Sequence, residues 1–214
     1  MRFADPVDMV YEGTVYRPPS EATSLILQAT IGCSHNTCTY CVSYLDKKFR
    51  IKSLKEIEHD IKAVLPYYRG TERIFLADGD ALAIPAPQLL ELLALLKKNF
   101  PKLERASIYG SPGNIRRKTV DELKALKNAG LGIIYIGLES GSDTILRAVK
   151  KGSLSKDMIA AAKKVREAGI PLSVIWILGL GGKERSEEHA TETARVLNAM
   201  DPEYAGALTL MVVE

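Results

Sequence analysis

Cysteine is scarce in this sequence and is confined to one short stretch. The 214 residues contain three cysteines, Cys33, Cys38 and Cys41. An odd number of cysteines, without the features of a signal peptide at the start of the sequence, argues against a disulfide framework. The sequence therefore predicts a cytoplasmic protein with reduced thiols.

Long apolar runs and a strong excess of charge are also missing. No apolar run reaches the length that a transmembrane helix needs, so no membrane segment is predicted. The net charge is +3 and Lys and Arg are scattered along the chain, which gives no strong indication of nucleic-acid binding. With 46% hydrophobic and 26% charged residues, the composition is typical of a soluble globular protein.

Apolar runs without polar alternation are each followed by a segment with helical spacing, except the last. The runs that predict strands are 24–30, 73–79, 105–111, 131–140, 171–180 and 204–214. The segments that predict helices are 53–68, 85–100, 119–130, 155–169 and 186–200. This order favours a parallel sheet covered by helices. We expect an α/β fold with a (β/α)6-type partial TIM barrel, and a doubly wound open sheet is the alternative.

The domain organisation follows from the same pattern. Residues 1–23 are predicted to be an irregular N-terminal extension, and residues 24–214 the barrel. The sequence stops just after the sixth strand, so the last covering helix of the pattern is missing. We expect a C-terminal part or a partner chain to supply it.

Several helix boundaries carry their own sequence signals. Ser53 with Glu56, and Thr119 with Glu122, have the spacing of capping boxes. Gly130 follows the last periodic residue of the third helix and is a predicted C-cap.

Glycine-containing loops follow five of the six predicted strands. In parallel α/β folds ligands bind at the C-terminal ends of the strands, and glycine lets backbone approach a ligand closely. These loops are 31–44, 77–81, 109–114, 138–143 and 178–184. Five such loops at one end of the sheet predict a single cofactor site.

Three thiols this close together in sequence can converge on one metal centre. In one interpretation they ligate three irons of a 4Fe–4S cluster and leave the fourth iron open. In a second, His35 joins them in a closed Cys₃His zinc site. A third possibility is three buried thiols without metal. The cluster is favoured, because zinc sites usually take their ligands from two separated pairs.

The string "GCSHNTCTYC" at 32–41 resembles the cluster motif of the radical S-adenosylmethionine (SAM) superfamily. The common spacing there is C-x-x-x-C-x-x-C, and this sequence has one more residue in the first gap. It is most similar to a subgroup near the elongator catalytic subunit and oxygen-independent coproporphyrinogen oxidase. The resemblance implies that the three cysteines bind a 4Fe–4S cluster.

The resemblance also implies where SAM would bind. It places Tyr40 beside the adenine, and "DGD" at 78–80 where the superfamily holds the methionine amino group. Asp80 is the expected contact, with Gly79 beside it and Asp78 as a weaker one.

Further SAM contacts are implied after the later strands. Ser111 and Asn114 stand where a carboxylate often contacts SAM, although "SPG" at 111–113 could equally be a simple turn. The remaining implied contacts are Glu139 and Ser140 for ribose or methionine, Lys151 for the SAM carboxylate, and Ile177 and Gly179 for the adenine. Lys150 or Arg147 could bind the carboxylate in place of Lys151.

The implied function is that of a radical SAM enzyme. Its reduced cluster would cleave SAM to a 5′-deoxyadenosyl radical, which abstracts hydrogen from a substrate. An electron donor such as flavodoxin or ferredoxin is then expected. The alternatives are a non-catalytic iron–sulfur carrier or sensor, and a zinc-stabilised barrel. The sequence assigns no catalytic residue and no substrate.

Overall fold

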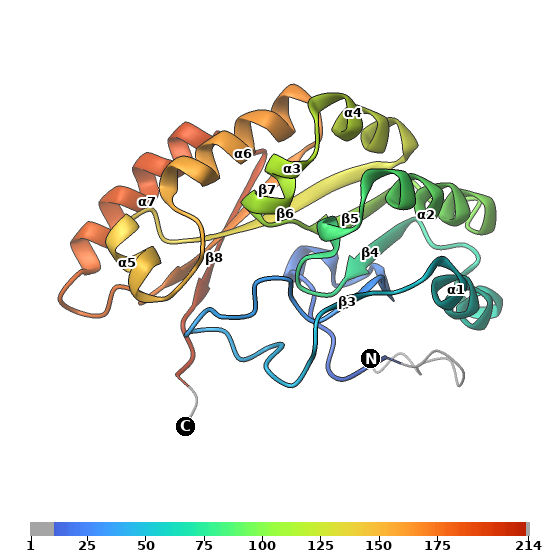
Figure 1. Ribbon diagram of the computed structural model, residues 1–214, viewed down its shortest axis with the longest axis horizontal. Helices are drawn as coiled ribbons and strands as arrows, with labels where there is room; N and C mark the ends of the chain where they lie inside the picture. Colours follow the sequence, from blue (N-terminus) through green and yellow to red (C-terminus); the bar gives the residue numbers. More distant parts are fainter. Residues whose placement is uncertain (1–10, 213–214) are drawn as a thin grey trace.

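The computed structural model describes residues 11–212 and shows an open, curved, parallel sheet (Figure 1). The strands pair in the order β1-β4-β5-β6-β7-β8, each neighbour parallel to the next. Their bounds are Leu25–Gln28 (β1), Arg73–Ala77 (β4), Arg105–Tyr109 (β5), Leu131–Glu139 (β6), Leu172–Leu178 (β7) and Tyr204–Thr209 (β8). The predicted partial TIM barrel is confirmed, with β1 and β8 as open edges.

Helices cover the outer face of this sheet, and the larger ones form an arc along one side in Figure 1. The α-helices are Leu54–Tyr68 (α1), Ala86–Asn99 (α2), Pro112–Arg117 (α3), Val120–Ala129 (α4), Asp143–Ala148 (α5), Ser155–Glu167 (α6) and Ser186–Met200 (α7). Two short 3₁₀ helices are Pro19–Glu21 (η1) and Ala81–Ala83 (η2). No helix follows β8 within the described residues.

Local sequence signals set several of these boundaries. Ser53 and Glu56 form the predicted capping box of α1, and Thr119 and Glu122 that of α4. Gly130 closes α4 in the left-handed conformation, with φ of 112°. The short helices α3 and α5 were not predicted, because six residues carry too little periodicity. The "SPG" segment is the first turn of α3 rather than a free turn.

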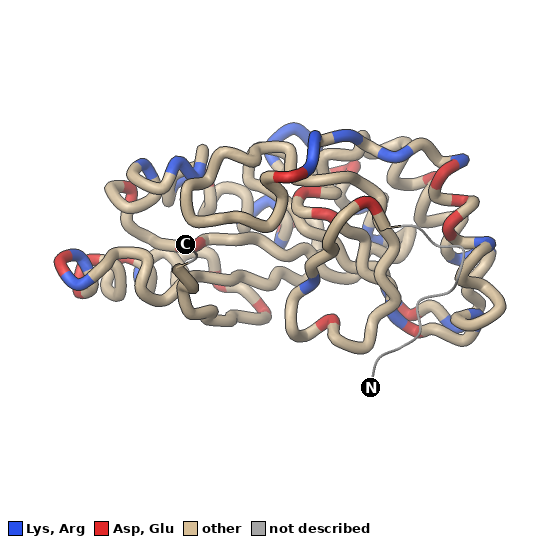
Figure 2. The backbone as a smooth tube through the Cα atoms, turned by 90° about the horizontal axis from the view of Figure 1, so that it is seen from below, with Lys and Arg blue, Asp and Glu red and all other residues tan. Residues whose placement is uncertain are grey.

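Both faces of the central strands β4, β5 and β6 are buried, which explains their missing polar alternation, whereas β8 at the edge is mostly exposed. On β4, Ile74 and Leu76 join the core between sheet and helices, whereas Phe75 and Ala77 face the concave inner side. The Phe75 ring makes edge-to-face contacts with Tyr109 at 5.0 Å and Tyr135 at 6.0 Å between centroids. Charged residues gather mainly on the outer helices and loops (Figure 2).

A second, two-stranded antiparallel sheet brackets the cysteines. It pairs β2, Thr30–Ile31, with β3, Arg50–Ile51. The segment between them, residues 32–49, lies on the side of the sheet away from the large helices (Figure 1). None of the helices in residues 11–212 is long and apolar enough to cross a bilayer.

The segment before β1 reaches the inside of the barrel through Glu21. This carboxylate is fully buried; it accepts hydrogen bonds from the Tyr135 hydroxyl at 2.6 Å and from the Ser24 hydroxyl, and pairs with Arg105 at 3.0 Å. Arg105 is the first residue of β5, so Glu21 lies at the end of the barrel opposite the glycine loops. The domain boundary at residue 23 stays a prediction, and residues 1–10 lie outside the described part.

Replacing Glu21 with Gln should destabilise the fold. Removing the charge leaves Arg105 without its anion in a partly buried place, and we expect the free energy of unfolding to fall by about 3 kcal/mol. Urea denaturation measures this change. Glu58→Gln is the control, since Glu58 forms only an exposed pair with Lys62 on α1, worth less than about 1 kcal/mol. Equal effects of the two substitutions would contradict this role for Glu21.

Candidate functional site

One buried carboxylate holds both ends of the cysteine segment. Asp78 Oδ2 accepts hydrogen bonds from the backbone N of Gly32, from Lys47 Nζ and from Gln28 Nε2, each at 2.9 Å. Gly32 precedes the first cysteine and Lys47 follows the last. The charged side chains of Lys47 and Asp78 are almost completely buried. Asp78 therefore supports the loop through Oδ2, whereas its buried Oδ1 has no hydrogen-bond partner within the described residues, and its contact with SAM stays a prediction.

The three thiols lie near one another on this loop. Burial raises the pKa of Cys38, and its neighbours Cys33 and Cys41 raise it further, while Lys151 opposes them. Burial also raises the pKa of Cys33. Both pKa values are raised on balance, and Lys151 acts in the opposite direction, towards the thiolate form that ligates iron.

His35 is turned away from a joint metal site. Its Nε2 lies 2.7 Å from the carbonyl oxygen of Lys150 and 2.9 Å from the Thr37 hydroxyl. A side chain at Gly152 would overlap the His35 ring, so the ring is packed against that turn. Within residues 11–212, no three His, Cys, Asp or Glu side chains are grouped to hold a single metal ion. Because that finding covers the three thiols as well, it is the hydrogen bonds of the His35 ring that disfavour the Cys₃His zinc site.

The donor set fits an iron–sulfur cluster with an open iron. Three thiols on one loop provide three ligands, and the end of β4 comes up against them. A Cβ at Gly79 would lie 2.5 Å from the Tyr44 ring and 3.0 Å from Cys33 Cβ. The backbone at 79 can approach the loop this closely because it has no side chain, as a cofactor-binding turn requires.

Asp80 joins the ends of β4 and β5 to the cysteine loop. Its carboxylate accepts hydrogen bonds from the backbone N of Ser111 at 2.9 Å, from Asn114 Nδ2 at 2.6 Å and from the Ser34 hydroxyl at 2.5 Å. The structure thus brings together three of the residues singled out in the sequence. A carboxylate has about four acceptor positions, so Asp80 keeps one for a further donor.

Glu139 and Lys151 form the charged part of the site. Glu139 ends β6 with a positive φ of 63°, and its Oε1 lies 2.7 Å from Lys151 Nζ. Burial lowers the pKa of Lys151, but the Glu139 carboxylate outweighs this and raises it, so the lysine is cationic. Lys151 also lies 3.4 Å from the Tyr40 hydroxyl, whose pKa is raised by burial and by the charge of Glu139.

The remaining predicted contacts lie at the ends of β6 and β7. Ser140 is fully buried, and its hydroxyl lies 2.8 Å from His189 Nδ1, so it bonds within the protein. Ile177 is half-buried in β7, and its carbonyl oxygen lies 2.9 Å from His189 Nε2. Gly179 follows β7 with a φ of 87°, a conformation that favours glycine.

Three residues that support the site were missed in the sequence. Ser34 directly follows Cys33, and Lys47 comes after the last cysteine, both without a distinctive spacing. The partner of Lys47 is Asp78, 31 residues away, and that of Ser34 is Asp80, 46 residues away. His189 stands in an amphipathic helix pattern and is buried on α7. A histidine on the buried face of a predicted helix could have been noticed, but its partners could not.

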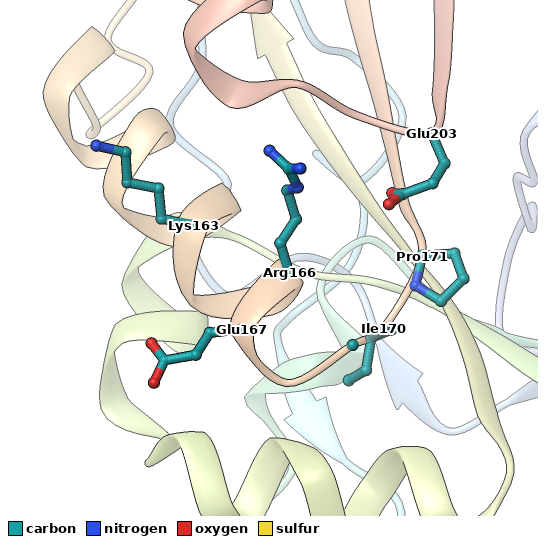
Figure 3. A pocket seen from close by; sticks show the side chains of 7 residues that line it. Lys163, Arg166, Glu167, Ile170, Pro171 and Glu203 are labelled. Carbon is teal, nitrogen blue, oxygen red and sulfur yellow. The ribbon is translucent and has the colours of Figure 1, made fainter.

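The structure has a separate cavity of about 480 Å³ at the opposite end of the barrel (Figure 3). Arg166 of α6 and Glu203, which precedes β8, lie on its two sides. Arg166 pairs with Asp201 at 2.6 Å, and Glu203 accepts a hydrogen bond from the backbone N of Leu172 at 2.7 Å. Both charged groups are therefore used within the protein, and this cavity is not part of the candidate site.

Comparison with known proteins gives a family and a fold. A model of the Radical SAM superfamily matches residues 27–197. A putative methylthiotransferase of Methanocaldococcus jannaschii is 28% identical over 69% of this chain and 33% of its own length. The haem chaperone HemW of Bacillus subtilis is 24% identical over 65% of this chain and 36% of its own length. The chain thus spans about a third of the length of these relatives.

Solved structures share the fold at low sequence identity. The radical SAM methyltransferase TsrM from Kitasatospora setae has a TM-score of 0.69 and 19% identity, over 87% of this chain and 34% of that chain. Coproporphyrinogen III oxidase HemN from Escherichia coli has a TM-score of 0.64 and 18% identity, over 89% of this chain and 44% of that chain. Both likenesses support the partial barrel.

Iron binding should depend on the thiols and not on His35. After anaerobic reconstitution with iron and sulfide, we expect Cys38→Ala to lose the visible absorption of the cluster and His35→Ala to keep it. The histidine ring is already bonded to Lys150 and Thr37, so its loss removes no ligand. Counting iron and sulfide per chain checks both. Stoichiometric zinc that needs His35, in protein purified without oxygen, would overturn this interpretation.

Proposed function

Because the chain belongs to the radical SAM superfamily, whose model matches residues 27–197, we propose that the glycine-rich end of its barrel is a radical SAM active site. The cofactors of the superfamily are a 4Fe–4S cluster and SAM. Cys33, Cys38 and Cys41 would hold the cluster, and the loops after the strands would hold SAM. When bound, the two cofactors supply a 5′-deoxyadenosyl radical that abstracts hydrogen from a substrate.

The convergence of Glu139, Lys151 and Tyr40 beside the thiols carries this proposal. The three residues come from the end of β6, the turn after α5 and the cysteine loop, and Lys151 Nζ contacts both of the others. Lys151 also acts electrostatically on Cys33 and Cys38. A cation, an anion and thiols at one place match the needs of a zwitterionic ligand that lies against a cluster.

The positions of the charged side chains support a separate contact with SAM for each of them. Lys151, cationic and largely buried, would bind the SAM carboxylate as a point charge, and Glu139 would bind the ribose or the methionine part. Asp80 would use its remaining acceptor position for the methionine amino group, with Gly79 close by.

The rest of the rim would enclose the cofactor. Ser111 and Asn114 would hold Asp80 in place, and Ile177 and Gly179 would border the adenine, with Tyr40 beside it. Ser140 would act through the backbone turn that it fixes.

A non-catalytic iron–sulfur protein is the alternative function. Such a carrier or sensor needs the thiols but no paired charges at the ends of later strands. The partly buried pair of Glu139 and Lys151, at 2.7 Å, favours the enzyme. Catalysis would require an electron donor such as flavodoxin or ferredoxin. The relatives include a methylthiotransferase and a haem chaperone by name, and these names indicate no common substrate.

Variants of the charged residues test the proposal. Asp80→Ala, Glu139→Ala and Lys151→Ala should each weaken SAM binding by roughly ten- to hundredfold, because each removes a charge-assisted hydrogen bond worth about 1.5–3 kcal/mol. The iron content should stay unchanged. Isothermal titration of SAM into the reconstituted protein measures the affinity.

Lys150→Ala provides the matched control, since Lys150 adjoins Lys151 but its side chain is exposed. Its SAM affinity should equal that of the unmodified protein. Normal affinity in all three site variants would overturn the site assignment, and no SAM binding by the unmodified, iron-loaded protein would favour the carrier.

A further inference from the structure

His189 joins the ends of two neighbouring strands from outside the sheet. It lies on the second turn of α7 and is 6% exposed. Its Nδ1 lies 2.8 Å from the Ser140 hydroxyl, just after β6, and its Nε2 lies 2.9 Å from the Ile177 carbonyl oxygen in β7. One buried ring therefore connects the two strand ends.

The hydrogen bond to Ile177 fixes the position of one ring proton. A carbonyl oxygen only accepts, so Nε2 must carry a proton and donate it to Ile177. In the neutral ring Nδ1 then accepts from the Ser140 hydroxyl, which itself accepts from the backbone N of Ser142 at 3.1 Å. Every donor in this series of hydrogen bonds therefore has an acceptor, from Ser142 after β6 to Ile177 in β7.

The turn after β6 lies directly on α7. The backbone N of Gly141 donates to Thr193 Oγ1 at 2.9 Å, and a side chain at Gly141 would overlap the Glu192 carbonyl oxygen. Ser142 also donates to Glu188 Oε1 at 2.5 Å. Residues 140–142 are thus seated on one face of α7, with His189 and Thr193 one turn apart on that face.

This seating matters because the sheet alone does not set the direction of Glu139. The pairing of β6 with β7 shifts register between Gly137 and Glu139, and Glu139 has a positive φ of 63°. Such a conformation is uncommon for a residue with a side chain and persists when its surroundings hold it. Glu139 itself is held by its ion pair with Lys151 and its pairing with Trp176 of β7, and the turn that follows it is held by His189 and Thr193.

We propose that His189 is a positioning residue, which fixes the spacing between Glu139 and the Ile177–Gly179 edge and so sets the affinity for the nucleoside half of SAM. The inference rests on the proposed function and deepens it. His189 acts through Ser140 and the Ile177 carbonyl, and needs no contact with SAM.

Three substitutions at His189 separate its two bonds. Phe keeps a ring of similar size but makes neither bond. Gln can place an amide NH₂ near the position of Nε2 and so keep the bond to Ile177. Asn can place its amide oxygen near Nδ1 and so keep the bond to Ser140.

The affinities of the full, iron-loaded chain for SAM and for 5′-methylthioadenosine, which lacks the amino-acid part, are measured by isothermal titration. We expect His189→Phe to weaken both ligands by about tenfold and by the same factor. His189→Gln and His189→Asn should each restore part of the loss, since each keeps one bond. Asp80→Ala, at the methionine end, should weaken SAM but not 5′-methylthioadenosine.

Val196→Ala controls for a purely structural effect, because Val196 is fully buried on the same helix but packs in the core between sheet and helices. It should lower the melting temperature and leave both affinities unchanged. Nitrogen NMR of the His189 ring should show a proton on Nε2.

Normal ligand affinities in His189→Phe, a proton on Nδ1 of the neutral ring, or equal losses of affinity in Val196→Ala would each overturn the inference. If the unmodified chain with its cluster bound no SAM, the proposed function would fail, and the inference with it. SAM binding that is indifferent to His189→Phe would leave the proposed function standing and remove only this role.

Discussion

The buried contact between Asp78 and Lys47 is the constraint on which the site depends. Burying two charges is costly unless they are paired and hydrogen-bonded, and here Asp78 Oδ2 has three donors while Lys47 also donates to the Thr14 carbonyl oxygen at 2.6 Å. The ends of the loop are paired through β2 and β3, and the ion pair ties this loop to the end of β4. It holds the cysteine segment over the end of β4, where the turn 78–80 begins.

The parallel sheet does the rest of the positioning. Parallel strands place their C-terminal ends on one side, so residues far apart in sequence meet there. Asp80 bonds Ser111 across 31 residues, and Lys151 reaches Tyr40 across 111. These contacts are largely shielded from water, so each contributes more to stability than a surface pair such as Lys62 with Glu58. The high dielectric constant of water weakens the attraction within such a surface pair. Glu21 lies at the opposite end of the barrel, where it pairs with Arg105, and takes no part in the candidate site.

Sequence patterns sufficed where the determining interaction is local. The capping boxes at Ser53 and Thr119 lie within four residues and were predicted correctly. The apolar runs predicted the parallel strands because both faces of the central strands β4, β5 and β6 are buried. The clustered cysteines predicted the superfamily, which is confirmed. Tertiary contacts decided the rest. The SAM contacts of Asp78 and Ser140 stay predictions; the sequence could not show that Asp78 Oδ2 bonds Lys47 or that the Ser140 hydroxyl lies beside His189.

The central claim is that an iron–sulfur cluster on the cysteine loop and SAM at the strand ends share one site. The most direct test is the electron paramagnetic resonance spectrum of the reconstituted, dithionite-reduced protein, recorded with and without SAM. We expect SAM to alter the signal of the reduced cluster, because SAM would bind at the iron to which the three thiols supply no ligand. A chain with one cluster whose spectrum is unchanged by saturating SAM would contradict it.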